Sequence, residues 1–97
     1  MSNIETDPSA LYVHCDAAMS YNSQSTGGVG YCFSAPENSD LDGISKSFGK
    51  YTKYNIETLE LTAINEAMKC VLHRYQLNPD VFKNLTQIVF ITDRFHI

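Results

Sequence analysis

Four segments of the chain show the alternation or the run of apolar residues that predicts β-strands. The first alternates over residues 10–16, with Leu11, Val13 and Cys15 on one side and less apolar side chains on the other. Short polar segments that contain Gly or Asp join the first three, so we expect an antiparallel meander. The predicted strands cover residues 10–16, 28–35, 44–51 and 86–92.

One longer segment, residues 56–75, repeats its apolar positions with the period of an α-helix. Asn55 is placed to cap its first turn, and Asn78-Pro79 is a stop signal after it. We expect one face of this helix to pack on the sheet. The predicted apolar face consists of Leu61, Ile64, Ala67, Met68, Val71, Leu72 and Tyr75.

The fourth strand segment is an unbroken apolar run, which is typical of a parallel strand covered on both faces at the centre of a sheet. The helix then serves as the right-handed crossover that brings this strand beside the first one. The pattern predicts an α/β domain of order β-β-β-α-β. Residues 1–9 are expected to form a flexible tail and residues 10–97 a single domain.

Composition and the N-terminal sequence limit the expected location of the protein and the classes of ligand that it can bind. Apolar residues make up 43% of the chain and no apolar run approaches a membrane span of roughly 20 residues. The N-terminus lacks the features of a signal peptide, so we expect a cytoplasmic protein without membrane contact. The net charge of −4 argues against binding nucleic acid through a broad basic surface, but allows an enzyme that holds cations between itself and phosphates.

Three carboxylates stand where their surroundings do not favour them. Asp16 and Asp93 each end an apolar strand, and adjacent parallel strands would bring both to the carboxyl edge of the sheet. Glu60 lies inside the apolar face of the helix, where a charge is costly unless it is paired or coordinated. The alternatives are turn residues for the two aspartates and, for Glu60, a place near the helix N-terminus with its carboxylate in solvent.

If the three carboxylates converge, they repel one another unless a cation lies among them. Mg²⁺ takes oxygen ligands and suits a few protein carboxylates. Two such ions would hold the attacking and the leaving oxygen of a phosphodiester.

The segments YVHCDAA, GGVGYCF, TLELTAINEAM and IVFITD resemble, in this order, the ribonuclease H family across residues 10–97. The resemblance implies a mixed five-stranded sheet flanked by helices, two Mg²⁺ or Mn²⁺ ions, and hydrolysis of the RNA strand of RNA–DNA hybrids. Asp16, Glu60 and Asp93 match the metal ligands of the family. The family continues with another helix, a fifth strand and a last helix bearing a fourth carboxylate, so the expected domain is truncated after its fourth strand.

Candidate substrate contacts precede the helix. Residues 46–54 interleave lysines with aromatics, a composition that can follow a nucleic-acid backbone, although a solvated strand edge has the same composition. The family contacts its substrate through an Asn-rich turn, which is reduced here to the segment that starts at Asn55. Lys50, Lys53 and Asn55 are therefore the candidate substrate-binding residues.

Three interpretations follow. The first is a ribonuclease H-type endonuclease that acts on RNA–DNA hybrids. The second is a catalytically impaired module of the same fold, which dimerises or is completed by a partner chain through the exposed edge of its fourth strand. The third is a fragment of a longer enzyme.

Overall fold

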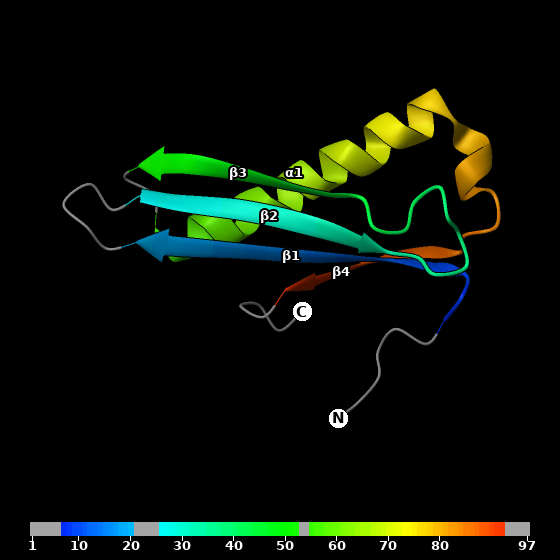
Figure 1. Cartoon of the computed structure of the whole chain (residues 1–97), viewed down its shortest axis with the longest axis horizontal. Helices are drawn as coiled ribbons and strands as arrows, with labels where there is room; N and C mark the ends of the chain where they lie inside the picture. Colours follow the sequence, from blue (N-terminus) through cyan, green and yellow to red (C-terminus); the bar gives the residue numbers. More distant parts are fainter. Residues whose placement is uncertain (1–6, 21–25, 53–54, 93–97) are drawn as a thin grey trace.

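The computed structural model describes residues 7–20, 26–52 and 55–92. These residues form a four-stranded mixed sheet with a long helix, α1, on one of its faces (Figure 1). This confirms the α/β class and the predicted order of strands and helix. The elements are β1 (Ala10–Ser20), β2 (Thr26–Ser34), β3 (Ser45–Thr52), α1 (Ile56–Leu77), the 3₁₀ helix η1 (Pro79–Phe82) and β4 (Gln87–Thr92).

The strand order is β3-β2-β1-β4. The first three strands are antiparallel neighbours, and β4 runs parallel to β1, from the pair Ala10–Gln87 to the pair Cys15–Thr92. The predicted meander and the helical crossover to a parallel strand are therefore confirmed. The expectation that β4 is central and covered on both faces is wrong for the described residues, because β4 is an edge strand there and Gln87 and Ile88 are exposed.

The first hairpin is longer than its polar sequence predicts. β1 continues to Ser20, and its extension pairs with the start of β2 as far as Ser20–Thr26. The reason is that ladder hydrogen bonds satisfy the backbone whatever the polarity of the side chains. The glycines of β2 serve close approach and a bulge: the register shifts between Gly27 and Val29, and a Cβ on Gly28 would lie 3.0 Å from the Phe48 carbonyl oxygen.

α1 packs on the sheet through a stripe of side chains of which the periodicity singled out only Ala67. Leu59, Ala63 and Ala67 are fully buried against β1 and β2. The alanines allow the helix backbone close to the sheet, which turns much of the larger apolar stripe away from it. The residues of the predicted face that are more than half exposed are Leu61, Met68, Leu72 and Tyr75.

No described helix is long and apolar enough to span a membrane.

The entry into β1 is tied to the start of β4. The Thr86 amide donates to the Ser9 carbonyl over 2.8 Å, and the Gln87 side-chain amide donates to the Asp7 carboxylate over 2.9 Å. These bonds extend the contact of the two parallel strands by three residues toward the N-terminus. They fix the register that brings both strand ends to the same edge.

Candidate functional site

Glu60 is a buried carboxylate in the second turn of α1. Its side chain is only 3% exposed, and the Thr92 hydroxyl at the end of β4 donates a 2.8 Å hydrogen bond to its Oε2 atom. The interpretation that Glu60 lies in solvent near the helix N-terminus is therefore wrong. A carboxylate is retained in such a place only where other groups compensate the loss of water.

The start of α1 is held by the predicted cap. The Asn55 Oδ1 atom accepts a 2.7 Å hydrogen bond from the Thr58 amide. This bond satisfies one of the free amides of the first turn. A contact of Asn55 with substrate stays a prediction.

The pKa of the Cys15 thiol also indicates where Glu60 lies. Burial raises the pKa of this thiol to about 11, and the nearby Glu60 carboxylate contributes to the rise. Cys15 is paired with Thr92 in the last pair of the β1–β4 ladder. Glu60 therefore lies where this ladder ends, on the face of the sheet that α1 covers.

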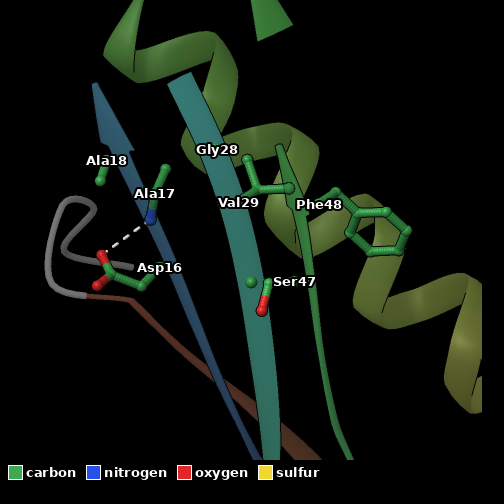
Figure 2. A pocket seen from close by; sticks show the side chains of 8 residues that line it. Asp16, Ala17, Ala18, Gly28, Val29, Ser47 and Phe48 are labelled. Atoms are coloured by element: carbon green, nitrogen blue, oxygen red, sulfur yellow. Dashed lines mark hydrogen bonds between the residues drawn. The ribbon is translucent and has the colours of Figure 1, made fainter. Parts of the chain in front are cut away.

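Asp16 is the next residue along β1 and reaches the same level from the other face. Successive side chains of a strand point to opposite faces, and Cys15 faces α1. The Asp16 carboxylate is exposed and accepts a 2.8 Å hydrogen bond from the Ala17 amide. Figure 2 shows it on the side of β1 away from β2, beside an open groove of about 280 Å³ that Gly28, Gly30 and Ser47 also line.

The structure thus brings two of the three predicted metal ligands to one end of the β1–β4 pair. β4 ends at Thr92, whereas β1 continues for five residues beyond Cys15. Asp93 follows directly but lies outside the described residues, and within those residues no group of three or more His, Cys, Asp or Glu is close enough to hold a metal ion.

Of the candidate substrate contacts, Lys50 lies on β3, which β2 separates from β1, while Lys53 is outside the described residues. Lys50 is exposed and has a φ of 66°, an unusual value for a residue other than glycine. It lines a groove of about 390 Å³ together with Ala18 and Gly28, which also line the groove beside Asp16. The two hollows therefore adjoin, and one extended ligand can lie in both.

The sequence reasoning did not find Thr92. Its signal was a hydroxyl residue at the end of an apolar strand, directly before an aspartate, and its role depends on a partner 32 residues away.

A scan against protein-family models finds no match, and searches of curated proteins and of solved structures find no significant similarity. The geometry of the chain and its sequence pattern are therefore the grounds for a function.

Proposed function

We propose that this domain is a metal-dependent endonuclease of ribonuclease H type, which hydrolyses the RNA strand of RNA–DNA hybrids. The observation that carries the proposal is the buried Glu60 carboxylate, held by Thr92 at the end of the β1–β4 pair where Asp16 lies on the other face of the sheet. Packing alone would be served as well by an apolar side chain of similar size. A buried charge at this position is explained if the carboxylate binds a ligand.

The donor atoms suit a hard divalent cation. Carboxylate oxygens are the ligands that Mg²⁺ and Mn²⁺ prefer, and Glu60, Asp16 and Asp93 would supply them. Within the described chain, Thr92 occupies Oε2 of Glu60, so Oε1 is available as a ligand. Bound ions of this kind activate the attacking water and stabilise the leaving oxygen of a phosphodiester.

The residues around these carboxylates would position the hybrid. Ala17 and Ala18 present backbone groups beside Asp16, and the glycines of β2 leave the neighbouring surface low, so a sugar-phosphate backbone can approach closely. Backbone contacts to 2′-hydroxyls there would distinguish RNA from DNA. Lys50, with Lys53 and Asn55, would contact phosphates on the way to the helix.

A cleavage assay tests this proposal. The protein is incubated with an end-labelled RNA–DNA hybrid and Mg²⁺ or Mn²⁺, beside Asp16→Asn and Glu60→Gln variants. Glu37→Gln is the matched control, because Glu37 is exposed in the turn after β2. We expect cleavage by the parent and the control and none by the other two variants. Absence of cleavage by the parent with either metal refutes the nuclease.

Calorimetric titration with Mn²⁺ tests the metal site without reference to activity. Asp16→Asn, Glu60→Gln and Asp93→Asn should each weaken Mn²⁺ binding at least tenfold, in line with the loss of one ligand. If Asp93→Asn leaves the affinity unchanged, Asp93 is not part of the site.

A second candidate function, an assembly module, is favoured by the edges of the sheet. β3, one edge, carries Lys46 and Lys50, whereas β4, the other edge, has no charged residue from Gln87 to Thr92. Natural edge strands usually carry charges that prevent pairing with other chains. Beside β4 is an apolar groove of about 330 Å³, lined by Met68, Leu72, Tyr75, Ile88 and Phe90 among others.

In this candidate, a second copy pairs its β4 antiparallel with the first. The uncharged strands allow two chains of net charge −4 to meet without like charges at the seam. Light scattering after gel filtration would then show a dimer that Ile88→Lys dissociates. Leu61→Lys is the control, because Leu61 is also an exposed aliphatic residue but lies outside the groove. A monomer at all accessible concentrations rules out this candidate.

A further inference from the structure

Another hollow, of about 360 Å³, lies between β3 and α1, and it is rich in cationic side chains. Lys46 comes from β3, and Lys69, His73 and Arg74 come from α1. Phe48 is among the residues that line it, and the Lys46 ammonium lies over the Phe48 ring, 5.2 Å from its centroid. We call this hollow the β3–α1 groove.

The charge of the groove is opposite to that of the chain. Three of the seven Lys and Arg residues line it, against one of the eleven Asp and Glu residues, in a chain of net charge −4. The single acid, Glu66, is paired with Lys69 at 3.2 Å. Lys46 and Arg74 have no carboxylate partner in the part of the chain that is described. Two cations thus face the groove without a counter-charge from the described protein.

The spacing of the cations favours a ligand that carries a row of anionic groups over a single small anion. Lys69 and Arg74 are five residues apart on α1, which is about 7.5 Å along the helix axis. Lys46 faces them from the other wall. The charges are therefore spread along the groove rather than directed at one point, as in surfaces that follow a phosphate backbone.

We infer that the β3–α1 groove binds backbone phosphates of a nucleic acid strand, as a contact separate from the carboxylate edge. The choice of nucleic acid as the ligand rests on the proposed nuclease function. Lys69 lies nine residues beyond Glu60, about 13 Å along the helix axis. A duplex covers this distance in about four base pairs. The groove would therefore hold the hybrid several nucleotides away from the scissile bond.

Binding is measured by fluorescence anisotropy of a labelled RNA–DNA hybrid in EDTA, where metal-dependent cleavage does not occur, over a series of salt concentrations. The test variant is a double variant that carries both Lys46→Gln and Arg74→Gln. Lys83→Gln is the matched control, because Lys83 is an exposed lysine after η1, outside the groove. Circular dichroism establishes that all variants are folded.

We expect the double variant to bind more weakly than the parent and to lose about 1 from the slope of log affinity against log salt for each phosphate contact removed. The control should keep the parental affinity and slope. Unchanged affinity and slope in the double variant, or no binding by the parent, overturns the inference. Binding that depends on the groove in a protein that does not cleave refutes the nuclease and leaves the groove standing, so the two failures are distinguishable.

Discussion

Replacing Thr92 with valine tests whether its hydrogen bond holds Glu60 in place. Valine keeps the shape of threonine but has no hydroxyl, so the Glu60 Oε2 atom loses the donor now at 2.8 Å. A hydrogen bond to a charged acceptor contributes about 1.5–3 kcal/mol. Because Glu60 is only 3% exposed, water replaces the lost donor poorly, and we expect a loss of about 2 kcal/mol in the free energy of unfolding.

The matched control is Thr92→Ser, which keeps the hydroxyl and loses one methyl group, at a cost of about 0.8 kcal/mol or less at this half-buried position. Urea unfolding followed by circular dichroism in metal-free buffer gives both values. On heating, a loss of about 2 kcal/mol corresponds to a melting temperature lower by roughly 8–16 °C in a domain of this size.

The same substitution in a Glu60→Gln background completes a double-mutant cycle. The neutral amide oxygen of glutamine is a weaker acceptor, so removal of the hydroxyl should then cost only about 1 kcal/mol. If Thr92→Val destabilises no more than Thr92→Ser, or costs the same with Gln as with Glu at position 60, the bond does not hold the carboxylate and the reasoning about its burial is refuted.

Three further predictions concern the surroundings of the site. Stability should fall as pH rises from 9.0 toward about 11, because the unfolded chain releases the Cys15 proton first, and Cys15→Ala should make urea unfolding less sensitive to this pH range. Gly27→Ala should lower the free energy of unfolding in urea by about 1–3 kcal/mol, because its Cβ would collide with the fully buried Leu59. Gly49→Ala is the control: a Cβ there meets nothing within 4 Å, so stability should change by about 0.5 kcal/mol or less. Asn55→Ala should lower stability by about 1 kcal/mol through loss of the cap, and a thermal melt that does not shift would contradict this.

Local features of the chain were predicted well because they depend on neighbours in sequence. The alternation around Val13, the cap at Asn55 and the stop at Asn78 follow from strand pleat, free helix amides and the geometry before proline. The parallel pairing of β4 with β1 also followed, because a helical crossover of this length leaves few other arrangements. Glu60 was noticed because a charge stood in an apolar pattern.

The sequence by itself therefore determined the elements, their order and the carboxylates that invite a functional reading. Only the tertiary structure decided which stripe of α1 packs on the sheet, since periodicity marks apolar positions without ranking Ala63 against Leu72. It also decided that Glu60 is buried and meets Thr92, and that Lys46 faces Arg74 across one groove. Such contacts join residues far apart in the chain, and close packing of the whole domain selects them, which no local pattern encodes.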